Sequence, residues 1–288
     1  MHTHQHSAYE PYLAGVVLLL TALIYVHGYV RMRRLAIGRG APWRAASFLL
    51  GLASIWVALG SRMAGLDHAS LTAHMVQHLL LMTVGAPLIW LGDPALPLFF
   101  GLPERVALWI KVPMLCSRWV HNVGRTLLNP ILCWLAASGA LIGWHIPSLF
   151  MLALHSQVWH LVEQGSFLVS GLMFWWPVIQ PWPSVRKPEW LSLVYLFLAT
   201  LPCDILSGLL VFSDRVVYVS YLSLPHPFGF SALEDQQCAG ALMWTVVTLI
   251  YLLAGTIIAA RLLTPRHSQE DPNVRVAVKA SHQSMEVA

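Results

Sequence analysis

The sequence predicts an all-α integral membrane protein, a bundle of seven transmembrane helices with its N-terminus outside and its C-terminus in the cytoplasm. Three observations support this class: few charged residues, long apolar segments, and a one-sided distribution of lysine and arginine. Only 10% of the 288 residues are charged, 57% are hydrophobic, and the mean hydropathy is +0.63. Soluble domains carry about 25% charged residues, so a lipid bilayer is the expected environment.

Seven segments stay apolar over the roughly 20 residues that a helix needs to cross a bilayer. Their expected limits are 12–30, 44–61, 70–91, 129–146, 158–179, 190–212 and 238–260. The stretch 94–115 is also apolar, but prolines and charged residues interrupt it, which predicts an interfacial or re-entrant segment. We therefore expect one seven-span domain over 1–262 and a polar, disordered cytoplasmic tail over 263–288.

Lysine and arginine predict the orientation. With the N-terminus outside, 15 of the 17 basic residues fall on the inner side, and only Arg62 and Arg215 fall outside. Basic residues accumulate in cytoplasmic loops, so this pattern favours an outer N-terminus. The net charge of +4 has the same origin, and we expect a lipid bilayer but no nucleic acid as a partner.

Histidine shows the opposite distribution, because ten of the 14 histidines fall in outer loops or in the outer halves of spans. Scattered surface histidines have no reason to prefer one leaflet, whereas a site that uses imidazole near the outer face does. The ten are His2, His4, His6, His68, His74, His78, His145, His155, His160 and His226.

The third span contains the stretch HMVQHLLLM, which runs from His74 to Met82. At about 100° per residue, His74, His78 and Met82 fall within about 80° of one another on a helix, and Met75 lies near 100°. They run from the outer interface roughly a third of the way into the bilayer. Imidazole together with thioether suits copper, above all Cu(I). The alternative interpretation is hydrogen bonding between helices by histidine, with methionine as packing filler.

Two other spans bring ionisable groups to the same depth. His145 ends the fourth span, and His160 and Glu163 lie at the outer start of the fifth. Such groups inside a membrane usually mark a functional site or a paired partner. We expect Glu163 to orient His160 through a hydrogen bond; direct ligation is the alternative. The expected metal ligands are His74, His78, Met82, His145 and His160.

Other polar residues have simpler explanations. His155 lies in a short outer loop, where a transient ligand role is the less favoured interpretation, and His27 at the inner end of the first span is expected to reach the interface. The stretch MHTHQH is interpreted as a polar tail, although it is able to collect copper from outside. The four cysteines form no C-x-x-C pair, so they predict neither a disulfide framework nor a thiolate copper motif.

Acidic and amide residues gather at the start of the seventh span, in the stretch LEDQQCAGALMW. Helix capping and favourable interaction with the helix dipole explain such a cluster. The same cluster, with Asp235 inside it, would also close a polar site from above.

Five stretches occur in a fixed order over most of residues 25–255: YVHGYVRMRRLAIGRGAPW, HMVQHLLLMTVGAPLIWLGDP, WHIPSLF, SFLVSGLMFWWPVI and FGFSALEDQQCAGALMW. Together they resemble the CtaG-type cytochrome c oxidase assembly factors of bacterial membranes. The resemblance implies a seven-span protein of the bacterial inner membrane that supplies or holds copper for a haem–copper oxidase. It implies oxidase subunits as partners, with a periplasmic copper donor as a further candidate. The matched motif positions are His74, Met75, His78, Met82, His145, Asp235 and Met243.

His160 matches a less rigid part of the family pattern, and a histidine is common in the family where this chain has Gln164, so one ligand is expected to be absent. We expect four residues to support the site rather than to form it. They are Met75, Glu163, Asp235 and Met243.

The expected function is therefore a non-enzymatic copper-binding assembly factor, and two alternatives stay open. The first is an electron-transfer protein that holds haem b. Bundles with two haems usually carry an inner and an outer histidine on one helix, whereas His74 and His78 lie only one turn apart. Haem is therefore not expected. The second is a copper importer, which should show polar or sulfur groups down to the inner face. Beyond Met82, the run TVGAPLIWLG offers none.

Overall fold

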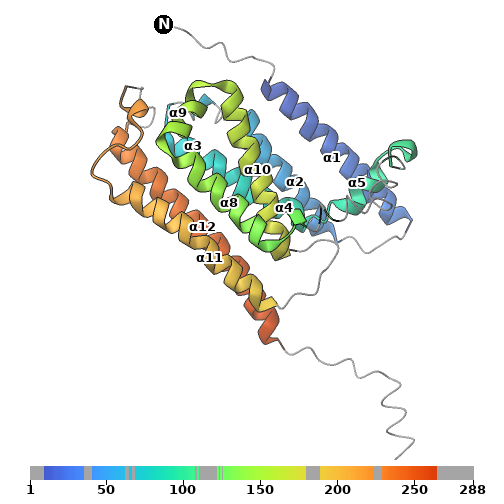
Figure 1. Cartoon of the computed structure of the whole chain (residues 1–288). Coiled ribbons are helices and arrows are strands. Elements are labelled where there is room, and N and C mark those ends of the chain that lie inside the picture. The colour runs from blue at the N-terminus through green and yellow to red at the C-terminus, as the bar shows by residue number, and fades with distance from the viewer. Residues whose placement is uncertain are drawn as a thin grey trace, which may run out of the picture.

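In the computed structural model, all regular structure of the described residues is helical (Figure 1). The structure describes residues 10–35, 41–61, 65–66, 69–107, 109, 122, 124, 126–179, 189–223 and 229–264. The N-terminal histidines, His68, His226 and the predicted tail beyond residue 264 lie outside this part of the chain.

The helices follow the predicted spans. The long ones are α1 (Glu10–Arg34), α2 (Pro42–Gly60), α8 (Pro130–His145), α10 (Gln157–Ile179), α11 (Glu189–Phe212) and α12 (Ala232–Leu263). The third span is one helical run of α3 (Leu71–Leu79), the π-helix η2 (Leu80–Gly85) and α4 (Ala86–Leu91). The short elements are α5 (Ala95–Gly101), α9 (Pro147–His155) and the 3₁₀-helix η3 (Val219–Ser223).

Among the described residues, five helices are long and apolar enough to cross a membrane: 12–34, 42–60, 71–91, 190–212 and 232–263. α8 and α9 together give a sixth candidate, bent by 77° between His145 and Pro147. α10 is not among them despite its 23 residues, because it carries the polar residues His160, Glu163 and Gln164. The structure thus supports a membrane protein with five or six candidate spans, while the seventh span and the orientation stay predictions.

The run of α3, η2 and α4 lies at the centre of the bundle and packs against α2, α10 and α12. α11 and α12 form a long hairpin along one side, and α1 lies at the opposite edge (Figure 1). Leu13 and Leu19 on α1 and Leu249 and Leu252 on α12 are 60% to 67% exposed. An outer surface of this kind suits lipid and would be costly in water.

The predicted interfacial segment is, over its described part, a short helix packed on the C-terminal half of α1. A Cβ atom on Gly28 would overlap the carbonyl oxygen of Pro97, and one on Gly101 would overlap that of Ile24. Only glycine allows α1 and α5 to approach so closely. The depth of this segment in the membrane stays a prediction.

The π-helix η2 interrupts the central helix beside the predicted site. Ser54 Oγ donates to the carbonyl oxygen of Leu80 at 2.9 Å, and Trp175 Nε1 donates to that of Met82 at 3.1 Å. A Cβ atom on Gly171 would lie 2.8 Å from Met82 Cα, so α10 rests directly on this turn. π-helical turns are frequent at functional sites, and neighbours on two helices hold this one in place.

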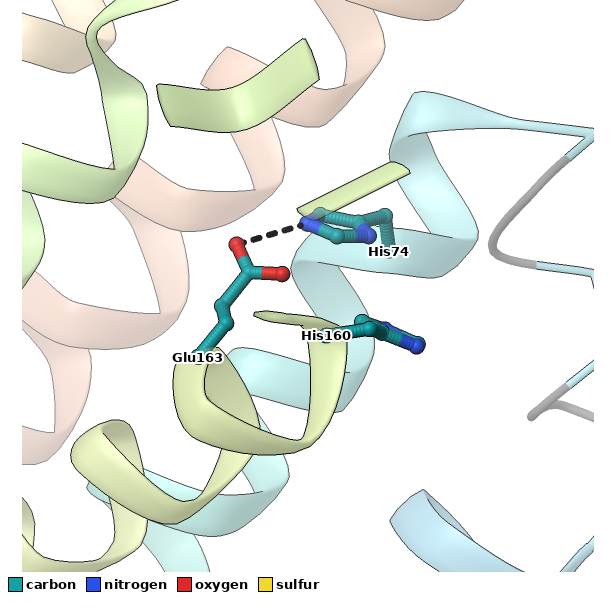
Figure 2. A group of neighbouring side chains, drawn as sticks. All are labelled: His74, His160 and Glu163. Atoms are coloured by element: carbon teal, nitrogen blue, oxygen red, sulfur yellow. Dashed lines mark ion pairs between the residues drawn. The ribbon is translucent and has the colours of Figure 1, made fainter. Parts of the chain in front are cut away.

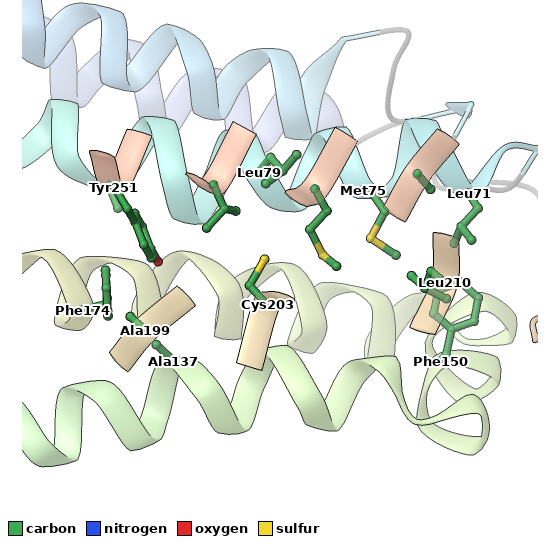
Figure 3. Packing of buried hydrophobic residues seen from close by; sticks show 14 of the residues in the cluster. Leu71, Met75, Leu79, Ala137, Phe150, Phe174, Ala199, Cys203, Leu210 and Tyr251 are labelled. Carbon is green, nitrogen blue, oxygen red and sulfur yellow. The ribbon is translucent and has the colours of Figure 1, made fainter. Parts of the chain in front are cut away.

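Apolar and aromatic side chains fill the core between α3, α8, α10, α11 and α12 (Figure 3). We call Phe174, Trp175 and Tyr251 the aromatic floor. The ring centroid of Tyr251 lies 5.4 Å from that of Phe174 and 5.7 Å from that of Trp175, and each residue is at most 8% exposed. These rings close the core on the side of the bundle away from the start of α3.

Candidate metal site

Three side chains from two helices form the centre of the candidate site (Figure 2). α3 contributes His74, and α10 contributes His160 and Glu163 from one face, because residues three apart are neighbours on a helix. One potential ligand atom of each residue lies within 4.8 Å of the others. His74 Nε2 is 3.4 Å from Glu163 Oε1. The structure therefore brings together predicted residues of the third and fifth spans.

His78 joins this group from the next turn of α3. Its Nε2 atom lies 3.6 Å from the same Glu163 oxygen, and its ring centroid lies 4.3 Å from that of His74. The ring stacks on Phe167 with the centroids 4.1 Å apart. Glu163 thus approaches both histidines of α3, whereas its spacing in the sequence predicted a hydrogen bond to His160.

Gln164 contacts His160 instead. Its amide nitrogen lies 3.2 Å from His160 Nε2, one helical turn away. Gln164, which stands where the family resemblance would place a histidine, therefore positions the ring of His160.

The polar atoms of the site are buried and unsatisfied. Glu163 is 0% exposed, His74 2% and His78 6%. Among the described residues, both carboxylate oxygens of Glu163 and both ring nitrogens of His74 and of His78 lack a hydrogen-bond partner. An unsatisfied buried polar group costs about 1–3 kcal/mol, and an isolated buried charge costs more. A cation held between these atoms removes the cost, because it meets the carboxylate charge and the nitrogen lone pairs together.

His145 faces a neighbouring cavity. Its Nδ1 atom lies 2.7 Å from the carbonyl oxygen of Leu141, an acceptor, so Nδ1 carries the proton and Nε2 keeps its lone pair. Nε2 is buried and has no hydrogen-bond partner in the described chain. Tyr218 donates to the His145 carbonyl oxygen at 3.0 Å and holds the end of α8. Burial and the nearby Glu163 carboxylate raise the pKa of Tyr218, so its hydroxyl keeps the proton that it donates.

The cavity has a volume of about 40 Å³ and lies between α3, α8, α10, α11 and α12. Five of the predicted residues line it, together with apolar side chains: Met75, His78, Met82, His145 and Met243. His78 is the residue that belongs both to this cavity and to the Glu163 group. The predicted single site therefore has two adjacent parts.

Asp235 anchors the start of the helix that carries the histidines. Its carboxylate accepts hydrogen bonds from the Leu71 amide at 2.7 Å, the Ser70 hydroxyl at 2.8 Å and the Thr72 amide at 3.3 Å. The first amides of a helix have no partners of their own, and a negative charge there is favourable. Asp235, from α12, supplies this cap and fixes the level of α3 against α12.

We expect Asp235→Ala to lower the free energy of unfolding by about 2–4 kcal/mol, because three bonds to a buried charged acceptor are lost. Thermal unfolding of the detergent-purified chain measures this. Asp235→Asn keeps one acceptor oxygen and should lower the free energy of unfolding by less. Glu234→Ala is the matched control, since Glu234 is exposed and caps only its own helix. Equal melting temperatures for Asp235→Ala and the unsubstituted chain would refute the anchoring role.

The structure also corrects one local prediction and adds three residues. His155 ends the helix α9 rather than lying in a loop, and its Nδ1 atom contacts the Met151 carbonyl oxygen at 2.8 Å. Sequence reasoning missed Ser70, Tyr218 and Cys203, whose thiol lines the cavity. A serine directly before a span signals a helix cap, but no local pattern reveals that Tyr218 bonds to a residue 73 positions away.

The fold and the site together define an α-helical membrane protein with a buried group of imidazoles and one carboxylate at one end of its bundle. The sequence matches the cytochrome c oxidase caa3 assembly factor family over residues 23–264. The chain belongs to this family.

Curated relatives are similar over most of the chain. Uncharacterized proteins of Mycobacterium bovis and Mycobacterium tuberculosis are each 27% identical to it over 250 residues, 82% of this chain and 36% of theirs. An uncharacterized protein of Mycobacterium leprae is 23% identical over 274 residues, 93% of this chain and 40% of its own length. The chain thus spans well under half the length of these relatives. No solved structure matches it.

Proposed function

We propose that the chain is a non-enzymatic assembly factor that binds copper as Cu(I) near the outer face of the bacterial inner membrane and hands it to a caa3-type oxidase. The observation that carries the proposal is the convergence of His74, His78, His160 and Glu163 in a chain whose family assembles a copper enzyme. Oxidase subunits are the partners, and a periplasmic copper donor is the source.

The donor set favours copper over other cargo. Imidazole suits several transition metals, while the thioethers next to this group favour a soft ion such as Cu(I). A Cu(I) ion beside Glu163 and neutral histidines leaves no net charge in the core, which keeps the cost of burial low. Magnesium and calcium prefer sets of six or more oxygen ligands, and this group offers one carboxylate.

The packing around the histidines speaks against haem. The ring of Phe150 lies 5.0 Å from His74, and the ring of Phe167 lies 4.1 Å from His78, centroid to centroid. The adjoining cavity of about 40 Å³ is far below the roughly 300 Å³ of pockets for larger organic ligands. A porphyrin would have to displace both aromatic rings.

The aromatic floor speaks against a copper importer. Phe174 and Tyr251 line the inner end of the cavity, and Trp175 packs against both. The lone pairs of these three side chains are those of the neutral Tyr251 hydroxyl, a hard oxygen donor that suits Cu(I) poorly. The arrangement favours loading and release of copper through the same end of the bundle.

Metal and haem analysis of the chain purified from copper-fed cells tests the proposal. We expect copper in stoichiometric amounts and no haem absorbance. A red protein with haem and no copper would favour the electron-transfer alternative, and a chain with neither after anaerobic Cu(I) loading would contradict the proposal.

The orientation has its own test, in a chain whose exposed Cys238 is replaced by serine. A cysteine at the exposed position of Glu234 should react with a membrane-impermeant maleimide in intact spheroplasts, because we expect this end to face outward. A cysteine at Arg33 should react only after permeabilisation. The reverse pattern would overturn the topology and place the site at the cytoplasmic face.

A further inference from the structure

We infer that the cavity beside the Glu163 group is a second, sulfur-rich Cu(I) site, and that His78 passes the ion between the two. The inference rests on the proposed function and deepens it by separating a site of nitrogen and oxygen ligands from one of thioethers. We call the group of His74, His160 and Glu163 the entry site, and the cavity lined by Met75, Met82, Met243 and His145 the thioether chamber.

Three helical segments supply thioether donors to the thioether chamber. Met75 comes from α3, Met82 from η2 and Met243 from α12, while the neutral thiol of Cys203 on α11 lines the chamber beside them. Figure 3 shows Met75 and Cys203 pointing from opposite helices into the same interior. Met75, Met243 and Cys203 are each at most 3% exposed. Buried methionine is often packing filler, so the assignment needs an observation beyond sulfur content.

Unsatisfied imidazole nitrogens provide that observation. His145 lines the chamber, and its Nε2 atom is buried without a hydrogen-bond partner in the described structure, whereas Leu141 occupies its other nitrogen. His78 also lines the chamber, and neither of its nitrogens has a hydrogen-bond partner in the described structure. Hydrocarbon and thioether neighbours hydrogen-bond weakly at best, and the hydroxyls that also line the chamber, those of Thr83, Ser138 and Tyr251, bond to none of these imidazole nitrogens. A metal ion satisfies both imidazoles, and the adjacent sulfurs decide which ion is preferred.

Helix geometry places His78 and Met243 at one level. Asp235 bonds to the amide of Leu71, so α3 and α12 start at the same height. His78 is seven residues beyond Leu71, and Met243 is eight beyond Asp235, which puts both about 10–12 Å deeper at about 1.5 Å per residue. The chamber volume of about 40 Å³ exceeds the roughly 10–15 Å³ that a cavity needs to hold one water molecule. One ion held by side chains therefore fits in it.

Transfer through His78 needs only ligand exchange. The ion gains a bond to a thioether or to His145 as it loses its bonds to Glu163 and His74, with His78 bound to it throughout. Copper stays Cu(I), and no proton moves, because thioether sulfur and imidazole nitrogen are neutral donors. Low coordination numbers and soft ligands suit such exchange.

Selenomethionine substitution tests the thioether chamber without changing a side chain's shape. The detergent-purified selenomethionine chain is loaded anaerobically with Cu(I), and X-ray absorption is read at the copper edge. We expect two copper ions per chain and a selenium neighbour at bonding distance from part of the copper. Copper binding without any selenium neighbour would overturn the chamber but leave the proposed function intact. A chain that binds no copper would overturn both.

Leucine variants provide the second measurement, since methionine and leucine exchange with little change in packing. The double variant Met82→Leu, Met243→Leu should bind one copper ion per chain in a titration against a Cu(I) chelator. Met173→Leu is the matched control, a methionine of α10 that does not line the chamber, and it should keep two. Equal stoichiometry in the double variant and the control would also overturn the chamber.

Discussion

His78→Ala is expected to abolish stoichiometric copper binding and maturation of the oxidase. His78 contacts Glu163 and also lines the thioether chamber, so its removal takes a donor from both parts of the site. The residue is only 6% exposed, which leaves little water to replace the missing ligand. Insertion into the membrane should persist, because the loss of one imidazole makes the span more apolar. Bound copper and oxidase activity are compared in cells with equal amounts of the variant and the unsubstituted chain.

His27→Ala is the matched control for this experiment. His27 lies exposed on α1, the helix at the far edge of the bundle. It should behave like the unsubstituted chain in both measurements. Normal oxidase activity in the His78→Ala strain would contradict the mechanism. An equal loss of activity in the His27→Ala strain would point to a structural role for histidine.

Glu163→Gln should separate copper binding from stability. The amide keeps the shape of the carboxylate but lacks its charge, so copper affinity should fall by at least about tenfold. Losing one partner at a metal site lowers the metal affinity by about 10- to 100-fold. The copper-free protein should become more stable, because the substitution removes a fully buried charge. An increase of about 1–3 kcal/mol in the free energy of unfolding corresponds to a rise of several degrees in melting temperature.

Thermal unfolding with and without Cu(I) measures both effects. Cu(I) should raise the melting temperature of the unsubstituted chain, as any ligand that binds only the folded state does, and should raise that of Glu163→Gln by less. Glu104→Gln is the control, because the Glu104 side chain is 83% exposed. If Glu163→Gln binds copper as tightly as Glu104→Gln does, the carboxylate has no part in the site.

The periodic features of the fold were predictable from the sequence. Apolar runs located the long helices, and the spacing of four between His74 and His78 predicted that both would lie on one face. Prolines predicted the interruption of the segment 94–115, whereas the bend at Pro147, which also lies at a proline, was not predicted. Sequence alone overstated the regularity of the third span, because the π-helix η2 depends on side chains of α2 and α10 that satisfy its carbonyl oxygens.

The internal organisation of the site was not predictable. Glu163 turns toward α3 rather than toward His160, and this choice depends on how α3 and α10 pack rather than on spacing within α10. The scattered cysteines gave no motif, yet packing places Cys203 beside three methionines. Asp235 was expected to cap a helix, but the helix it caps lies 163 to 165 residues away in the sequence. Such tertiary contacts carry no signal in one sequence.

The copper-to-haem ratio of the caa3-type oxidase isolated from cells that lack this chain tests the central claim most directly. Supply of copper by the chain predicts an oxidase that retains its haem but is poor in copper, with the ratio restored by the unsubstituted chain and not by His78→Ala. An oxidase with its full complement of copper in the absence of the chain would contradict the proposal that this protein delivers the metal.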